Sequence, residues 1–143
     1  MYLRFAFEGD VHETLETIPL AVRRKLDLAG LKLSLAGWKA LIRAERLALC
    51  HLPVDAPADL DVYREALRGF SERAGHPVVP LEGGPVDAAD WGAGKVPAAV
   101  GTRIDVAEWA VLSEEARYVL RKLADPKRDS AKFDLALGEL RRT

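Results

Sequence analysis

The sequence predicts an all-α fold, a compact helical domain over residues 1–143, and three observations favour it. Apolar residues recur at helical spacing along most of the chain, whereas no convincing alternating strand pattern appears. Hydrophobic residues make up 49% of the chain and charged residues 30%, which is enough to close one core without a metal or a disulfide. One segment also closely resembles another, which is typical of a repeated helical unit.

Two short-helix/long-helix units are predicted, at about residues 33–53 and 104–124. The two segments match without a gap at one constant offset, and in each a tryptophan is followed by a leucine and an arginine at the same spacing: Trp38, Leu41 and Arg46 in the first, Trp109, Leu112 and Arg117 in the second. Ser34 and Asp105 stand before the tryptophan turns as helix caps. We expect both tryptophans to be buried in equivalent positions.

The first fifth of the chain predicts two helices. Asp10 and Glu13 have the spacing of a capping box, so a short helix to about Thr17 should follow. Pro19 suits the first position of the next helix, and Gly30 suits its end. The apolar stripe of that helix is expected to be buried, and its charged residues are expected on the other side: Ile18, Val22, Leu26 and Ala29 in the stripe, and Arg23, Arg24, Lys25 and Asp27 opposite.

The middle of the chain predicts a connecting helix and then a long loop. Leu60, Tyr63, Leu67, Phe70 and Ala74 describe one helical face. Residues 75–95 are rich in glycine and proline, so we expect a loop that is either functional or mobile, with Trp91 more exposed than the other two tryptophans. Short extended pieces are expected at 31–33 and 78–79. Ser113 and Asp129 are expected to cap the last two helices.

The charge balance argues against two classes of partner. The chain holds 21 Lys and Arg against 22 Asp and Glu, so its net charge of −1 gives no overall field that attracts nucleic acid or an anionic membrane. No apolar stretch approaches the roughly 18 residues of a membrane span, and no signal peptide is recognised. We therefore expect a cytoplasmic protein.

No residues form a pattern typical of catalysis, cofactor binding or metal binding, so none are assigned to these roles. Cys50 and His51 lack further ligands at zinc spacing, since His12 and His76 lie far off in the sequence. We interpret Cys50 as a small semi-buried residue and His51 as a surface group near a helix end. Glycine pairs in the 75–95 loop lack the strand and helix of a phosphate-binding loop.

Two sets of basic residues are open to two interpretations each. Arg46 and Arg117 are candidates for anion capture or for a packing contact, indole-stacked or carboxylate-paired, and we favour packing because a structural repeat predicts it. The charged ridge of Arg23, Lys25, Asp27 and Lys32 is either a solvated face or an interaction surface for an acidic partner or nucleic acid. The ridge is our candidate interaction surface.

A specific block of residues resembles a known family. The resemblance is to the bacterial nitrate reductase-associated proteins, it extends over nearly the whole chain, and its block from Ile18 to Trp38 is the most specific part: Ile18-Pro19, Val22-Arg23, Lys25-Leu26-Asp27, Gly30, Lys32-Leu33, Leu35 and Trp38. It implies a non-catalytic accessory protein in nitrate assimilation with a protein partner, either nitrate reductase or its maturation machinery. The alternatives are a small helical regulatory or nucleic-acid-binding module and a small-ligand enzyme with the long loop as a lid.

Overall fold

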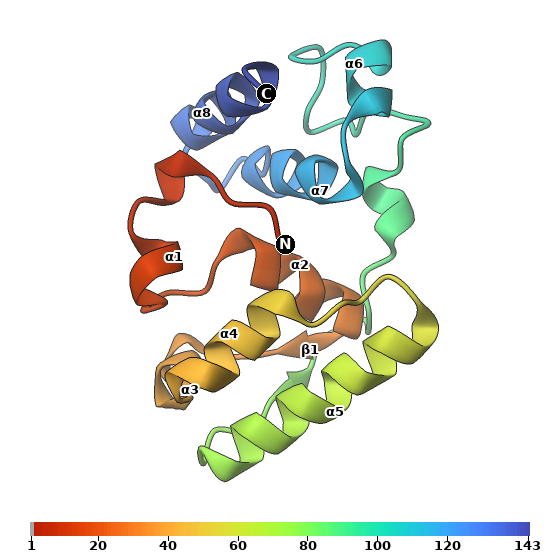
Figure 1. The fold of residues 1–143 in the computed structure, drawn as a ribbon. Coiled ribbons are helices and arrows are strands. Elements are labelled where there is room, and N and C mark those ends of the chain that lie inside the picture. The colour runs from red at the N-terminus through yellow and green to blue at the C-terminus, as the bar shows by residue number, and fades with distance from the viewer. Residues whose placement is uncertain (1) are drawn as a thin grey trace. The chain divides into compact units, whose positions relative to one another are not determined.

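The computed structural model describes residues 2–143, which divide into two compact units. Unit 1 consists of Tyr2 and Asp10–Asp87, and unit 2 consists of Leu3–Gly9 and Ala88–Thr143. The mainly helical fold class is confirmed, since these residues form eight α-helices, and one sheet of two very short strands accompanies them (Figure 1). Folding of residues 1–143 as one domain stays a prediction.

Unit 1 contains five α-helices and both strands. In chain order they are α1 (Val11–Thr14), α2 (Leu20–Ala29), β1 (Leu31–Lys32), α3 (Leu35–Ala40), α4 (Arg43–His51), α5 (Pro57–Arg73) and β2 (Val79–Pro80). Helices α2, α4 and α5 contact one another, and α3 packs on α5. The predicted stripe of α2 is buried, and the tryptophan of α3 and the apolar face of α5 complete this core with Val22, Trp38, Leu49, Tyr63 and Leu67 fully inaccessible.

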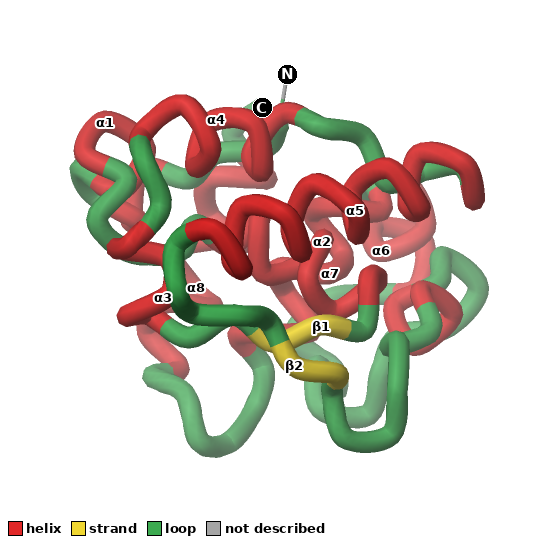
Figure 2. Tube along the Cα trace, turned by 90° about the horizontal axis from the view of Figure 1, so that it is seen from below, coloured by secondary structure: helices red, strands yellow, loops and turns green. Residues whose placement is uncertain are grey.

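The sheet connects two segments that are far apart in the sequence. β1 and β2 run antiparallel, with Leu31 opposite Pro80 and Lys32 opposite Val79, and they lie side by side in Figure 2. Gly30 makes the entry to β1 possible, because its φ of +73° is in the left-handed region and a Cβ there would lie 2.7 Å from a ring carbon of Pro85. The short extended pieces predicted at 31–33 and 78–79 are thus confirmed, although the first ends one residue earlier and the second lies one residue later than predicted.

Unit 2 holds the remaining helices. It contains two 3-10 helices, η1 (Ala6–Glu8) and η2 (Ala88–Trp91), and three α-helices, α6 (Val106–Val111), α7 (Glu114–Leu123) and α8 (Ser130–Arg141). Helix α7 packs on α8 and η2, and η1 packs on α8. The apolar stripe of α7 at helical spacing, Ala116, Val119, Leu120 and Leu123, is buried, and Phe133 of α8 is inaccessible.

Residues 3–9 are secured to unit 2 by two carboxylates. Glu115 accepts from the Leu3 backbone N–H at 3.1 Å. Glu139 accepts from the N–H groups of Ala6 at 2.6 Å and Phe7 at 3.2 Å. Backbone donors that have no helical partner are satisfied in this way, so the N-terminal segment is fixed by side chains from α7 and α8.

The predicted helix caps are confirmed in four cases. The side chains of Ser34, Asp105, Ser113 and Asp129 each accept from a backbone N–H in the first turn of the helix that follows. Glu108 has the spacing to complete a capping box with Asp105, but its carboxylate binds Arg141 instead, at 2.9 and 3.0 Å.

The capping box predicted at Asp10 is wrong. Its side chain makes no capping hydrogen bond, and α1 ends at Thr14 because Leu15 takes a left-handed conformation with φ of 52°. The next helix begins one residue later than predicted, since Pro19 is its N-cap and not its first residue. None of the helices described in residues 2–143 has the length and apolar character needed to cross a bilayer.

Candidate functional site

The first tryptophan–arginine pair is built into the core of unit 1. Trp38 is fully buried, and its indole Nε1 donates to the Leu15 carbonyl at 2.8 Å. Arg46 donates to the same carbonyl at 3.2 Å, to the Trp38 carbonyl at 3.1 Å and to the Lys39 carbonyl at 2.8 Å. The guanidinium thereby ties the end of α3 and the strained turn at Leu15 to α4.

The second pair has similar roles in unit 2. Trp109 is fully buried and donates to the Gly92 carbonyl at 2.8 Å. Arg117 donates to the Trp91 carbonyl at 2.7 Å and to the Leu112 carbonyl at the end of α6. Each arginine therefore joins its short helix to a segment earlier in the chain.

Both arginines are packing residues in this structure. The burial predicted for Trp38 and Trp109 is confirmed. The expected partners of Arg46 and Arg117 were an indole face or a carboxylate, but the observed partners are backbone carbonyls. Donors engaged in this way hold the backbone, and they are not directed at an external anion.

The exposure predicted for Trp91 is wrong, since only 2% of this residue is exposed. Its indole Nε1 donates to the Glu114 carboxylate at 2.9 Å, and its ring meets Tyr118 edge-on with 5.0 Å between centroids. The glycine-rich composition of residues 75–95 suggested a solvated loop, but its last residues form η2 and pack on α7. Aromatic burial outweighs local loop composition here.

The predicted ridge is interrupted at Lys25, which is only 6% exposed. Its Nζ donates to the carbonyls of Cys50 at 2.7 Å and Leu52 at 2.6 Å. These carbonyls lie at the end of α4, where a cation is favoured by the helix dipole. The expectation that Lys25 lies on a solvated side is therefore wrong. Arg24 is equally buried and reaches Asp55 at 3.5 Å.

The remaining ridge residues do not form one continuous charged surface. Arg23 and Asp27 of α2 are half-buried, and Lys32 on β1 is exposed. The structure thus leaves Lys32 as the most accessible member of the predicted set.

Cys50 and His51 occupy different environments. Cys50 is fully buried, which is deeper than the semi-buried position we predicted, and His51 is exposed in the last turn of α4 as expected.

Tyr63 of α5 is hydrogen-bonded to the same helix, since its hydroxyl donates to the Leu49 carbonyl at 2.9 Å. Burial, and secondarily the nearby Cys50, raise the pKa of Tyr63 well above its ordinary value. In the part of the chain that the structure describes, no three His, Cys, Asp or Glu side chains gather as a metal set.

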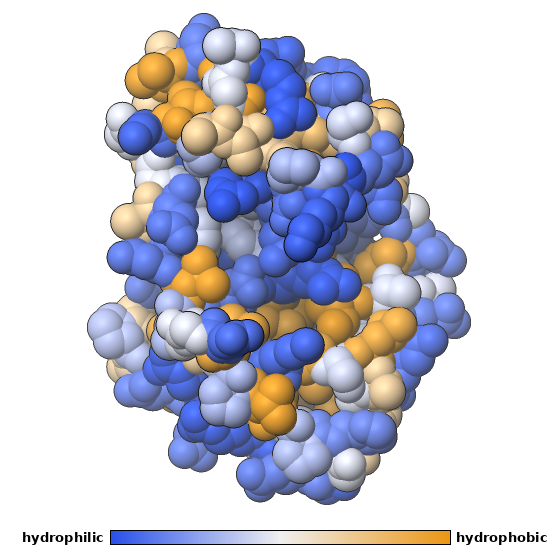
Figure 3. Space-filling model, turned by 180° about the vertical axis from the view of Figure 1, so that it is seen from behind, coloured by the Kyte–Doolittle hydropathy of each residue, from blue (hydrophilic) through white to orange (hydrophobic). Residues whose placement is uncertain are grey.

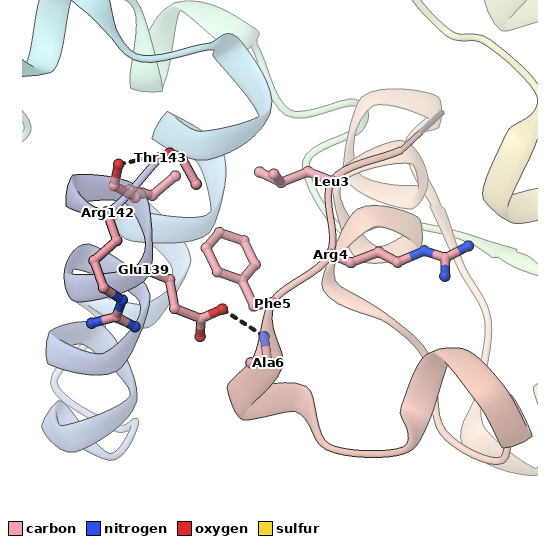
Figure 4. Close-up of a pocket in the computed structure, with 8 residues that line it drawn as sticks. Leu3, Arg4, Phe5, Ala6, Glu139, Arg142 and Thr143 are labelled. Atoms are coloured by element: carbon pink, nitrogen blue, oxygen red, sulfur yellow. Dashed lines mark hydrogen bonds between the residues drawn. The ribbon is translucent and has the colours of Figure 1, made fainter.

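The described residues of each unit form an open hollow. One, of about 280 Å³ in unit 2, lies between residues 3–6 and the end of α8, and Figure 4 shows the Phe5 ring directed toward α8 and the Arg4 guanidinium directed away from it. Glu139 in its wall is already engaged with the Ala6 N–H. The other, of about 240 Å³ in unit 1, is lined by Lys32, Ser34, His76, Pro77 and Val79.

Large exposed hydrophobic residues are distributed over several elements. They occur on α3, α5, β2, α6 and α8 and just before α4: Leu35, Val62, Val79, Val106, Val111, Leu135 and Ile42. On the face drawn in Figure 3, hydrophobic residues appear as patches among hydrophilic ones. Scattered apolar residues of this kind are normal on protein surfaces.

The fold and these contacts define a small, mainly helical protein in which buried tryptophans, arginines and a lysine hold chain segments together through backbone carbonyls. The chain belongs to the family described as conserved nitrate reductase-associated protein, which it matches over residues 4–140. The resemblance found in the sequence is thereby confirmed over nearly the whole chain. No curated protein and no solved structure matches it.

Proposed function

We propose that this protein is a non-catalytic, cytoplasmic accessory protein of nitrate assimilation, which acts by contact with nitrate reductase or with a factor in its assembly. The family match over residues 4–140 carries the proposal, because the family is described by its association with nitrate reductase.

The positions of the polar side chains support a role by contact. A general acid, base or nucleophile must reach a substrate with its reactive atom. The nitrogen atoms of Lys25, Arg46 and Arg117 instead donate to backbone carbonyls, and Cys50 is inaccessible. The candidate residues with the strongest contacts therefore stabilise the fold, and exposed residues such as Lys32 are left for recognition.

We also propose that the two tryptophan-bearing segments descend from one duplicated unit. The caps Ser34 and Asp105 both have extended backbone and both accept from the N–H three residues on. The following short helices end at Leu41 and Leu112 with nearly the same angles, φ −72° and ψ 149° against φ −70° and ψ 151°. Such agreement supports a common origin, and superposition of residues 33–52 on 104–123 in an experimental structure would test it.

A binding experiment tests the proposed function. The purified protein is immobilised and titrated with purified nitrate reductase from the same cells, and separately with extract of nitrate-grown cells to capture assembly factors. Saturable binding of the reductase or of an identified assembly factor is expected, with no consumption of nitrate or nitrite by the protein alone. If neither binds, or if the protein itself turns over nitrate or nitrite, the proposal is wrong.

The alternative function is that the ridge of Arg23, Lys25, Asp27 and Lys32 binds nucleic acid, and it has less support in this structure. Burial of Lys25 removes one of the three cations of the ridge, and the neighbouring Arg24 is buried too. A duplex-binding protein would show an affinity that falls steeply as salt rises. We expect no such affinity at physiological salt.

A further inference from the structure

The hollow of about 240 Å³ in unit 1, which we call the Lys32 hollow, brings together residues from two distant parts of the chain. Lys32 and Ser34 come from β1 and the link to α3, whereas His76, Pro77 and Val79 come from the link after α5 and from β2.

The walls of the Lys32 hollow are held by hydrogen bonds. Sheet pairing sets Lys32 directly opposite Val79. Ser71 of α5 is fully buried, its Oγ accepts from the Val78 N–H at 3.1 Å, and its carbonyl accepts from the His76 N–H at 3.0 Å. Residues 76–78 are therefore fixed to α5 at both ends, and Val79 is fixed to β1.

Gly37 allows the two walls to approach each other. A Cβ at this position would lie 2.8 Å from Leu33 Cδ1, 3.1 Å from Ser34 Oγ and 3.3 Å from His76 Cβ. A side chain at Gly37 would thus displace His76 from the first turn of α3. The Gly37 N–H donates to Ser34 Oγ at 2.9 Å, which leaves the Ser34 hydroxyl proton able to donate elsewhere.

The polar lining of the hollow offers donors. Lysine carries an ammonium, a neutral imidazole has one N–H, and the serine hydroxyl has one proton to donate. Among the described residues neither Lys32 nor His76 takes part in an ion pair or a side-chain hydrogen bond. The other two lining residues, Pro77 and Val79, are apolar, and Val79 is 52% exposed. Donors beside an apolar wall suit a carboxylate carried on a short aliphatic stem.

We propose that the Lys32 hollow receives a glutamate side chain from an acidic segment of the protein partner. The carboxylate binds at Lys32, His76 and Ser34, and its methylene groups pack on Pro77 and Val79. This inference rests on the proposed function, because it names the chemistry of the surface that the partner presents.

A titration of the isotopically labelled full chain tests the ligand class by NMR. The probes are acetyl-Glu-Glu-Glu-amide, its all-glutamine counterpart and sodium acetate. We expect the glutamate peptide to shift the signals of residues 32, 34 and 76–79 at concentrations where the other two probes do not. Equal shifts with the glutamine peptide, equal shifts with acetate, or shifts scattered outside the hollow would each overturn the inference.

A matched pair of charge reversals tests the partner. Lys32→Glu places a negative charge in the hollow, whereas Lys39→Glu makes the same charge change at an exposed residue of α3 that does not line it. Capture of nitrate reductase should weaken by about tenfold for Lys32→Glu and by less than about twofold for Lys39→Glu, with unchanged circular dichroism for both.

The two proposals fail in different ways. If the reductase binds the native protein and both variants equally, the hollow is not its contact and this inference is wrong while the proposed function stands. If the reductase and the assembly factors do not bind the native protein, the proposed function is wrong, and the peptide titration still decides whether the hollow takes an acidic segment.

Discussion

Replacing Lys25 by methionine should destabilise the protein, because it removes the ammonium that donates to the carbonyls of Cys50 and Leu52. Methionine is unbranched and of similar length, so packing around the stem is largely retained. Two carbonyls at the end of α4 would then be left without their donor, and the favourable cation at this helix end would be lost.

The expected loss in the free energy of unfolding of the Lys25→Met variant follows from two opposing effects. A hydrogen bond to a charged group contributes about 1.5–3 kcal/mol, so two such bonds contribute about 3–6 kcal/mol. Methionine does not incur the desolvation cost of a buried ammonium, and this offsets part of the lost contribution. We expect a net loss of about 2–3 kcal/mol in the free energy of unfolding. At about 4 °C per kcal/mol for a chain of this size, the melting temperature should fall by roughly 8–12 °C.

Urea unfolding followed by tryptophan fluorescence measures this loss, since all three tryptophans are buried in the native state. Lys32→Met is the matched control, because Lys32 is exposed and its replacement should change the free energy of unfolding by less than about 0.5 kcal/mol. If the two substitutions lower the free energy of unfolding by equally small amounts, Lys25 does not stabilise the fold and its side chain is solvated.

Three further predictions concern other side chains that hold the fold. Trp91→Ala should cost about 3–5 kcal/mol in urea unfolding, as for a core aromatic residue, and a loss below about 1 kcal/mol would contradict its burial. Arg46→Gln and Arg117→Gln should each lower the melting temperature while capture of nitrate reductase is retained, because both guanidinium groups bind backbone carbonyls; full stability with lost capture would make them binding residues. The raised pKa of Tyr63 means that its contribution to stability is complete below its unfolded pKa of about 10 and is lost as pH rises above it. In the Tyr63→Phe variant the free energy of unfolding should fall less steeply between about pH 10 and 11 than in the native protein. An equal slope in both proteins would contradict the raised pKa of Tyr63.

Helix starts were the most predictable features of this chain. The caps at Ser34, Asp105, Ser113 and Asp129 depend on a side chain and a backbone N–H only two or three residues apart, so their signal is contained in a short stretch of sequence. Asp10 shows the limit of the same reasoning, because its backbone is not extended and its carboxylate makes no capping bond to α1.

Features set by distant contacts were not predictable. Lys25 lies on the charged side of its own helix, but the carbonyls that bury it belong to residues 50 and 52. Trp91 lies in a glycine-rich stretch, but Glu114 and Tyr118 of α7 enclose it. The Lys32 hollow depends on sheet pairing between residues 31–32 and 79–80, so Lys32 was the one polar lining residue that the sequence indicated as part of an interaction surface.

The carboxylates that hold residues 3–9 have a consequence for how the protein is made and degraded. During synthesis these residues leave the ribosome long before Glu115 and Glu139, so residues 3–9 lack their acceptors until those two carboxylates have emerged. Unit 2 is consequently completed only after α8 has been synthesised. A protease that removes α8 frees the Ala6 and Phe7 N–H groups and leaves the Leu3 N–H bound to Glu115, and one that removes residues 3–9 deprives Glu139 of its two backbone donors. Loss of either segment therefore loosens the other.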